Sequence, residues 1–322
     1  MKSFTINSND AGQRLDRFIS KSLPNLPQAL MYKYIRKKRI KLNGKRAEIS
    51  TRLSEGDVVD MYINDEFFEK SETRYDFTGA SDRLDIIYED GNIMLLNKKA
   101  GLLCHPDDTE YVDTLISRIK KYLYKNGEFV PDDESSFTPA LVNRIDRNTG
   151  GIVIAAKNAE SLRILNAMMK KRCIKKLYLC VVHGIMERSE GLLSGFLLKD
   201  EKNNMVRILS SPAEGAKEIS TQYRVLDVDR EKNLSLVEVR LLTGRTHQIR
   251  AHFASIGHPL LGDGKYGTNR LNREFGYNKQ FLYSYKLAFD FDGDAGILGY
   301  LNGREFEIGD VWFVEAFKNG SI

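Results

Sequence analysis

The sequence predicts an α+β protein in which a small basic α/β domain precedes a larger body built on a mixed, largely antiparallel sheet. Three observations support this fold class. Positive charge is concentrated near the N-terminus, strand-length apolar segments outnumber helical patterns in the rest of the chain, and the two patterns do not alternate regularly. A doubly wound parallel sheet would require that alternation.

The charge distribution sets the N-terminal domain apart. Residues 1–62 contain 13 Lys and Arg against 6 Asp and Glu, a net of +7, whereas the whole chain of 322 residues carries +5. The remaining 260 residues therefore sum to 5 − 7 = −2. A basic module joined to a near-neutral body is typical of proteins that bind polyanions.

Within this module, eight basic residues and no acidic residue lie between Met31 and Arg46. Apolar residues at i, i+4 spacing around Tyr34 predict a helix, which a strand, an Asn43–Gly44 turn and a second strand follow. A solvated charged surface would explain an isolated charge run, but RNA phosphates require this kind of clustering. The predicted RNA-binding residues are Lys33, Arg36, Lys37, Lys38, Arg39, Lys41, Lys45 and Arg46.

Residues 12–63 resemble the small RNA-binding domain named after ribosomal protein S-four, through the opening Arg14-Leu15-Asp16, the basic helix, the Asn-Gly turn and Gly56-Asp57. We accordingly place this domain at residues 1–63. Residues 64–82 are polar and lack a sustained period, which predicts a linker. The strand-rich body then occupies residues 83–322.

The stretch "LVNRIDRNTGG", residues 141–151, places Asp146 between Arg144 and Arg147 in a predicted loop next to a strand. A nearby guanidinium favours the ionised carboxylate, and an ionised aspartate can act as nucleophile or base. A structural ion pair is the alternative interpretation.

Two further stretches contain candidate functional residues. Alternation in "KKLYLCVVHG", residues 175–184, puts Tyr178 on one face of a strand, where a tyrosine is usually a packing residue. In "LLTGRTHQIRAHFASIGHPLLGDGKYG", residues 241–267, a strand ends at Thr243-Gly244 and a helix is predicted to begin near Thr246. Arg245 therefore lies at a junction from which its side chain can project into a cleft. The core positions predicted for this helix are Ile249, Phe253 and Ile256.

Together these stretches resemble the pseudouridine synthases of the RluA type. The resemblance covers about residues 84–290. Two of its motifs are short: Arg-x-Asp-x-x-Thr, and a Lys-x-Tyr strand that ends in Gly184. The other two are Thr-Gly-Arg-Thr-His-Gln-Ile-Arg with the following Gly-His-Pro and Gly-Asp, and "LLNKKAGLLCHP" at residues 95–106. The chain departs from the family pattern where Asn143 replaces a common His, Gly150 a frequent Ser and Lys99 a frequent Pro.

The resemblance implies isomerisation of uridine to pseudouridine, with large-subunit ribosomal RNA as the substrate and without cofactor or metal. It implies that Asp146 attacks ribose carbon-1′ or removes a proton from carbon-2′. It further implies that Arg245 pairs with Asp146, that Tyr178 serves as base or aromatic face, and that Arg144 fills the gap left by a flipped uridine. The remaining residues implied to bind substrate are Thr149, Thr243, His247, Gln248 and Arg250.

Two other functions remain open at the level of sequence. A non-catalytic RNA-binding or ribosome-assembly protein would explain the basic module but would leave Asp146 and Tyr178 without a role. A glycosidase would require two facing carboxylates, and only one convincing candidate is present. Because the N-terminus lacks a secretory signal and no apolar run reaches the ~20 residues needed to cross a bilayer, we expect a cytoplasmic monomer without membrane contact. The spacing of the three cysteines fits no zinc motif.

Overall fold

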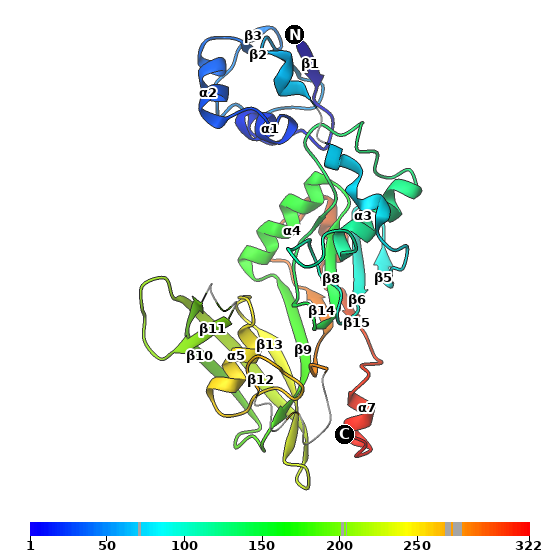
Figure 1. Cartoon of the computed structure of the whole chain (residues 1–322), viewed down its shortest axis with the longest axis vertical. Helices are drawn as coiled ribbons and strands as arrows, with labels where there is room; N and C mark the ends of the chain where they lie inside the picture. Colours follow the sequence, from blue (N-terminus) through cyan, green and yellow to red (C-terminus); the bar gives the residue numbers. More distant parts are fainter. Residues whose placement is uncertain (70–71, 201–202, 204, 268–271, 273–278) are drawn as a thin grey trace.

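The computed structural model describes residues 1–69, 72–200, 203, 205–267, 272 and 279–322. Within these residues the chain forms a small N-terminal unit and a larger body, each with its own sheet (Figure 1). The body contains the larger sheet, and a single helix of the body, α4, points toward the N-terminal unit. The mixed α+β architecture predicted from the sequence is confirmed.

The N-terminal unit is a four-stranded antiparallel sheet in the order β1-β4-β2-β3, packed with two helices. Asn43 and Gly44 have positive φ values of 50° and 73°, which suit the tight turn between β2 and β3. The predicted helix and hairpin are therefore confirmed. The elements are β1 (Lys2–Thr5), α1 (Leu15–Ser22), α2 (Gln28–Arg36), β2 (Ile40–Leu42), β3 (Lys45–Arg46) and β4 (Val58–Met61).

The sheet of the body follows the order β11-β10-β12-β13-β9-β14-β8-β6-β5, with β15 beside β14 and β7 beside β8. All of its pairings are antiparallel except β8 with β14, where Tyr283 aligns with Gly150. Its strands are β5 (Ile86–Glu89), β6 (Ile93–Lys98), β7 (Ala140–Leu141), β8 (Gly150–Ala156), β9 (Ile174–His183), β10 (Glu190–Asp200), β11 (Met205–Leu209), β12 (Lys217–Asp229), β13 (Leu234–Leu241), β14 (Leu282–Phe289) and β15 (Glu305–Glu307).

Helices cover parts of this sheet: α3 (Leu115–Lys125), α4 (Ala159–Lys171), α5 (Gln248–Ser255) and α7 (Val314–Lys318). The Asn158 side chain caps α4 by accepting the Ser161 N–H. Helix α5 begins at Gln248, later than expected, because His247 adopts a left-handed backbone with φ 55°. Ile256 follows the helix and is 41% exposed, so its predicted place in the core was wrong.

The two faces of β9 contribute to different cores, as its alternation predicted. Tyr178, Cys180 and Val182 pack toward α5, in one cluster with Phe253. Leu179 and Val181 pack on the opposite face with the C-terminal segment. Because β9 is clamped on both faces and paired on both edges, Tyr178 has a rigid support.

Between the two units lie two short 3-10 helices, Asp65–Phe68 and Glu72–Gly79. Phe67 and Phe68 pack on the N-terminal core, whereas Phe77 is buried in the body beside α3. Apolar side chains at both ends of this segment therefore attach it to the two neighbouring cores. Among the residues described, no helix is long and apolar enough to span a membrane.

Direct polar contacts hold the N-terminal unit against the body. The Asn9 side chain accepts the Ala159 N–H (3.1 Å) at the start of α4 and donates to Glu134 (2.7 Å). The Ser136 hydroxyl donates to Asp10 Oδ1 (2.5 Å). The Arg163 guanidinium donates to the Ala11 carbonyl (3.0 Å). These contacts give the N-terminal unit a defined position on α4.

Asp10 makes this junction sensitive to pH. Burial raises the pKa of its carboxyl above the ordinary value, although its hydrogen bonds with Ser136 oppose the shift. The Asp10 carboxyl therefore keeps its proton to a higher pH in the folded protein than in the unfolded chain, where it releases the proton near about pH 4. The contribution of Asp10 to stability falls as pH rises above that value. We expect Asp10→Asn to gain thermal stability relative to the unmodified protein as pH rises above about 4. A pH-independent difference between the two melting temperatures would contradict this assignment.

Candidate active site

A cleft of about 1400 Å³ opens between the loop before β8, strand β9 and the start of α5. It brings together residues that lie far apart in the sequence. Asp146 comes from the loop, Tyr178 from β9, and Arg250 from α5. Of the site residues predicted from the sequence, the cleft is lined by Arg144, Asp146, Thr149, Tyr178, Arg245, His247, Gln248 and Arg250.

Asp146 lines this cleft from a partly exposed position. Its side chain is 24% exposed, and Oδ2 accepts a hydrogen bond of 2.9 Å from Arg250 Nη1. The expected pairing with Arg245 is therefore corrected to Arg250. Because α5 begins only at Gln248, Arg250 is in its first turn and points inward, whereas Arg245 is exposed in the preceding loop.

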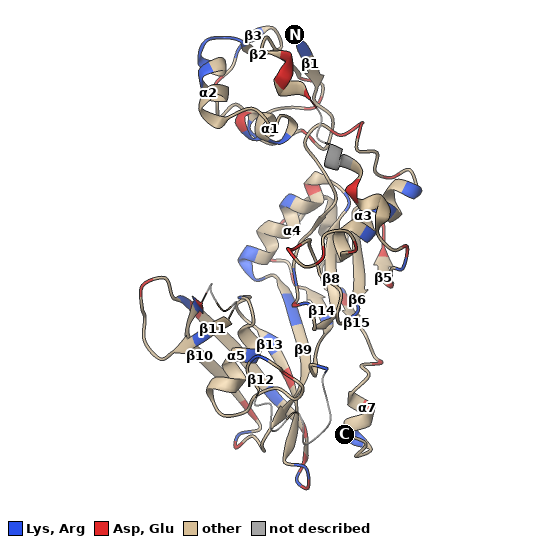
Figure 2. Cartoon of the chain, in the orientation of Figure 1, with Lys and Arg blue, Asp and Glu red and all other residues tan. Residues whose placement is uncertain are grey.

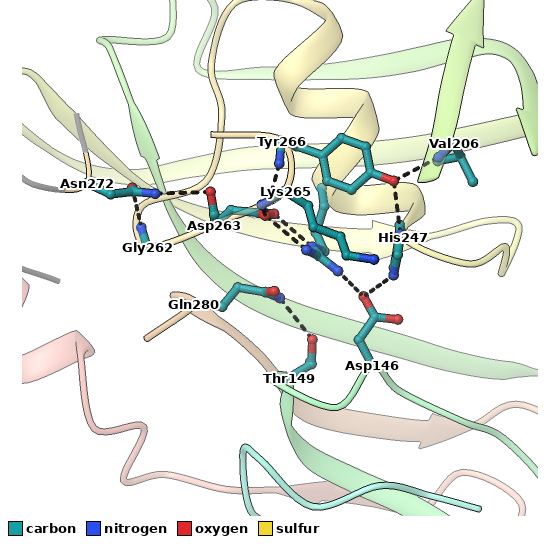
Figure 3. Close-up of polar contacts among 11 residues, drawn as sticks. Asp146, Thr149, Val206, His247, Gly262, Asp263, Lys265, Tyr266, Asn272 and Gln280 are labelled. Atoms are coloured by element: carbon teal, nitrogen blue, oxygen red, sulfur yellow. Dashed lines mark hydrogen bonds and ion pairs between the residues drawn. The ribbon is translucent and has the colours of Figure 1, made fainter. Parts of the chain in front are cut away.

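Arg250 is itself fixed by a second carboxylate, that of Asp263. Its Nε and Nη2 donate to the two oxygens of Asp263 at 2.7 and 2.9 Å, which forms a bidentate pair. Asp263 also accepts the backbone N–H groups of Lys265 and Tyr266. Figure 3 shows Asp146 and Asp263 on either side of this contact network. The remaining nitrogen of the fork, Nη1, is thereby directed at Asp146.

The electrostatics favour a permanent charge on Arg250. Burial opposes that charge, but the hydrogen bonds and negative charges of Asp263 and Asp146 outweigh it and raise the pKa of Arg250. The hydrogen bonds from Arg250 in turn lower the pKa of Asp263 despite its burial. A positive charge next to Asp146 is therefore built into the resting site.

The loop of Asp263 needs glycine at its start. Gly262 has φ 73°, and a Cβ at this position would lie 1.8 Å from the Lys279 carbonyl oxygen. Asp263 was missed as a site residue because a sequence pattern does not reveal which carboxylate is buried. The Gly-Asp pair in a loop rich in glycine was the available signal.

His247 faces Asp146 from the other side. Its Nε2 lies 3.9 Å from Asp146 Oδ2, and its Nδ1 lies 2.9 Å from the Tyr266 hydroxyl (Figure 3). That hydroxyl oxygen also accepts the Val206 N–H at 2.9 Å. Burial lowers the pKa of His247, although the charge of Asp146 opposes this shift. If Tyr266 donates to Nδ1, the neutral ring holds its proton on Nε2, the nitrogen that faces Asp146.

Lys98 lies beneath the Asp146 loop and is only 1% exposed. Its ammonium donates to the carbonyls of Leu102 (2.7 Å), Arg147 (3.0 Å) and Lys99 (3.1 Å). Burial lowers the pKa of Lys98 to about 8, with the nearby Asp146 opposing the shift. Because Arg147 directly follows Asp146, this contact ties the loop to the end of β6. The sequence reads Lys98 as an ordinary strand residue, and nothing in its spacing marks it as buried.

Tyr178 lies in the cleft wall as a neutral phenol. Burial raises the pKa of Tyr178 to about 12, and the charge of Asp146 adds to that shift, while a hydrogen bond with Ser284 opposes it. A tyrosine that acts as a base would need a nearby cation to lower its pKa. No such cation contributes to the pKa of Tyr178. The aromatic face is therefore the part of Tyr178 that suits contact with a base.

Thr149, Thr243 and Gln248 hold the walls of the site together. Thr149 accepts a hydrogen bond from Gln280 (3.0 Å) and closes the Asp146 turn through its N–H. The Gln248 amide binds Thr243 (2.9 Å) and Thr221 (2.9 Å). With their polar atoms engaged by protein partners, these three residues are suited to positioning the cleft rather than to contacting substrate.

Most of the other cations that the sequence predicted to contact RNA are exposed. Arg144 and Arg245 lie on the cleft with exposed side chains. Of the eight basic residues predicted to bind RNA in the N-terminal unit, Lys41 is half-buried and the other seven are exposed.

The structure accounts for two of the three departures from the family pattern. At Gly150 a Cβ would lie 2.5 Å from the Tyr283 ring, so the close approach of β14 excludes a larger residue unless that ring moves. Asn143 accepts the Ile154 N–H at 2.8 Å and thereby joins the Asp146 loop to β8. Nothing in the structure explains Lys99.

Comparisons with known proteins identify the family of this chain. The family described as RNA pseudouridylate synthase matches residues 92–255, and the S-four domain family matches residues 13–59. The chain belongs to the RNA pseudouridylate synthase family. It is thus an isomerase of the pseudouridine synthase type with an S-four domain, and the RluA-type resemblance of its motifs is confirmed.

Relatives of this synthase match over most of their length. An uncharacterised RNA pseudouridine synthase of Mycoplasma genitalium is 32% identical over 89% of the chain and 88% of its own length. The ribosomal large subunit pseudouridine synthase C of Vibrio cholerae is 31% identical over 88% of the chain and 87% of its own length. The solved structure of human RNA pseudouridylate synthase domain containing 1 has a TM-score of 0.55 at 23% identity and covers 71% of this chain and 84% of its own. The last similarity supports the fold.

The geometry of the synthase predicts different roles for Arg250, which contacts Asp146, and Arg245, which does not. We expect Arg250→Ala to lower kcat about a hundredfold or more, because Asp146 loses the contact that fixes its position. Arg245→Ala is the comparison variant, and it should lower kcat far less than Arg250→Ala because Arg245 is exposed and makes no contact with Asp146. Single-turnover assays measure both. Arg250 is buried, so Arg250→Lys and a thermal melt are needed to separate loss of activity from loss of fold. The assignment fails if Arg245→Ala is the more damaging substitution.

Proposed function

We propose that this synthase isomerises uridines of large-subunit ribosomal RNA with Asp146 as the reacting carboxylate. The observation that carries the proposal is the partly exposed carboxylate of Asp146, which is held at 2.9 Å by a buried and doubly paired Arg250 within the cleft. The reaction breaks the bond between uracil nitrogen-1 and ribose carbon-1′ and forms a bond from carbon-5 to carbon-1′. The carbon-5 proton leaves and nitrogen-1 gains one, so no cofactor is consumed.

An ionised aspartate fits both chemical routes. It can attack carbon-1′ and form a covalent ester that the rotated base later displaces. It can instead remove the proton from carbon-2′ and return it after rotation of the base. In each route Arg250 holds the Asp146 carboxylate in place before reaction. His247, whose Nε2 faces the same oxygen, is placed to donate a hydrogen bond as the carboxylate shifts.

The other cleft residues receive positioning roles under this proposal. Tyr178 offers its ring to the uracil and remains protonated at neutral pH. Arg144 and Arg245 are exposed cations on the cleft, which suits phosphate contact or occupation of the gap left by the extruded uridine. Thr149 and Gln248 fix the walls against which the nucleotide lies.

The substrate class rests on two kinds of support. Several relatives at about 30% identity are named ribosomal large subunit pseudouridine synthase C. The S-four domain adds the exposed cations of α2 and the following hairpin, which suit RNA phosphates. A ribosomal RNA substrate in turn places the enzyme in the cytoplasm, where we propose that it acts as a monomer.

Asp146→Asn tests the central role. The amide oxygen can still accept from Arg250, so the fold and the RNA affinity should stay within severalfold of the unmodified protein. Pseudouridine formation should fall below detection, because an amide is neither a nucleophile nor a base of comparable strength. Tritium release from carbon-5-labelled large-subunit RNA measures turnover, and filter binding measures affinity. Retained turnover would remove Asp146 from the reaction.

Tyr178 gives a second test. Because general acid–base catalysis contributes ~10²–10⁴-fold, Tyr178→Phe should lower kcat by less than about tenfold if only the ring acts. Tyr178→Leu removes the ring and should lower kcat much further. A loss above about a hundredfold in Tyr178→Phe would instead assign the hydroxyl to proton transfer.

A further inference from the structure

Helix α4 joins the two parts of the molecule that would contact RNA. Its first residue, Ala159, donates its N–H to Asn9 of the S-four unit. Near its other end, Met169 lines the cleft. With 13 residues at ~1.5 Å each, α4 spans about 20 Å. RNA held by both the S-four unit and the cleft would have to pass along or near this helix.

The solvent face of α4 is basic. Arg163, Asn166, Ala167 and Lys170 follow i, i+3, i+4, i+7 spacing and are all exposed, which makes them one surface. The helix ends with Lys171 and Arg172, also exposed. We call the four cations Arg163, Lys170, Lys171 and Arg172 the α4 ridge. None of the four forms an ion pair with a described acidic residue, whereas the exposed Lys125 and Lys318 each pair with a carboxylate.

The ridge continues into the cleft. After Arg172, which has a left-handed backbone with φ 64°, the chain turns directly into β9. Lys176 on β9 lines the cleft two residues before Tyr178. At the position of Gly244 on the opposite wall, a Cβ would lie 3.5 Å from the Lys176 ammonium. Lys176 thus lies in the sequence between the end of α4 and Tyr178, the residue proposed to contact the uracil.

The ridge also continues into the S-four unit. Arg17 and Lys21 are exposed on α1. The pKa of Lys21 is lowered, first by partial burial and also by the positive charges of Arg17 and Arg163, while Asp10 opposes the shift. These three cations therefore lie close together across the junction. Figure 2 shows blue segments on α2 and at the far end of α4 on the same side of the molecule.

We propose that the α4 ridge binds the sugar-phosphate backbone of the RNA segment between the S-four unit and the flipped uridine. The cations of the ridge repel one another, and neighbouring phosphates relieve that repulsion while releasing counterions. The contacts at Asn9 and Arg163 hold the S-four unit at a fixed place on α4, so the ridge also sets the distance from the S-four-bound RNA element to the target. The inference rests on the proposed RNA substrate.

The test is the double substitution Lys170→Gln/Lys171→Gln. Both side chains are exposed, and glutamine has nearly the same helix propensity as lysine. The matched control is Arg230→Gln/Lys318→Gln, which removes two exposed cations from the β12–β13 turn and from α7, away from α4 (Figure 1). The probe is transcribed large-subunit RNA. Filter binding over a salt series gives Kd, and tritium release gives KM and kcat.

Each phosphate contact contributes ~0.7–0.9 to the slope of log affinity against log salt, so the ridge variant should lose about 1.4–1.8 from that slope. Its fall in affinity between 50 and 200 mM salt should be about tenfold smaller than that of the control. KM should rise while kcat stays within severalfold, since neither residue reaches the reacting atoms. Circular dichroism verifies that the helix is intact.

The outcomes separate the two proposals. An unchanged salt slope and KM in the ridge variant, with an active parent protein, overturns the ridge and leaves the proposed function standing. No pseudouridine in any large-subunit transcript overturns the proposed substrate, and the salt slope of binding still decides the ridge. A fall in kcat without a change in KM would also overturn the ridge, because it would indicate an effect on the catalytic centre.

Discussion

One guanidinium shared by two carboxylates organises the active site. Asp263 is sealed from solvent and takes two nitrogens of Arg250, while Asp146 lies open to the cleft and takes the third. A buried charge pair of this kind is costly to break, since removal of one partner leaves the other uncompensated at ~3–5 kcal/mol. The position of Asp146 therefore depends on the loop of Asp263, which holds Arg250 in place. Stability and the geometry of the site are joined at this point, because the interaction that neutralises Asp263 also holds the side chain of Asp146 in the cleft.

The surrounding contacts constrain Asp146 from its remaining sides. Lys98 holds the backbone of its loop from below through the Arg147 carbonyl, and His247 faces its Oδ2 from the side. Tyr178 closes the wall from a strand that is paired on both edges and packed on both faces. Burial shifts the pKa of each of these three groups, whereas Asp146 keeps contact with solvent. The site thus combines a rigid, desolvated frame with one accessible carboxylate, which suits the proposed reaction on a flipped nucleotide.

The sequence predicted much of this and missed specific parts for physical reasons. Alternation in β9 correctly assigned Tyr178 and Leu179 to opposite faces, since a period of two leaves no ambiguity within a strand. The choice between Arg245 and Arg250 could not be made from spacing, because it depends on where a short helix starts, and the left-handed His247 delays that start. The roles of Lys98 and Asp263 depend on burial among backbone donors and acceptors, which residue identity does not encode. The family motifs nevertheless lie in the loop, strand and helix that line the cleft.

The central strand β14 has a consequence for when the enzyme can first work. It lies between β9 and β8, and its pairing with Gly150 and Gly151 is the contact that unites the two halves of the large sheet. Residues 282–289 follow both Asp146 and Tyr178 by more than 100 positions in the sequence, so they are synthesised later. Until then the Asp146 side and the Tyr178 side lack the strand that joins them, and bringing such distant segments together is slow. The nascent polypeptide should therefore remain inactive until β14 has been synthesised and paired, even though its RNA-binding module precedes that strand and can fold earlier.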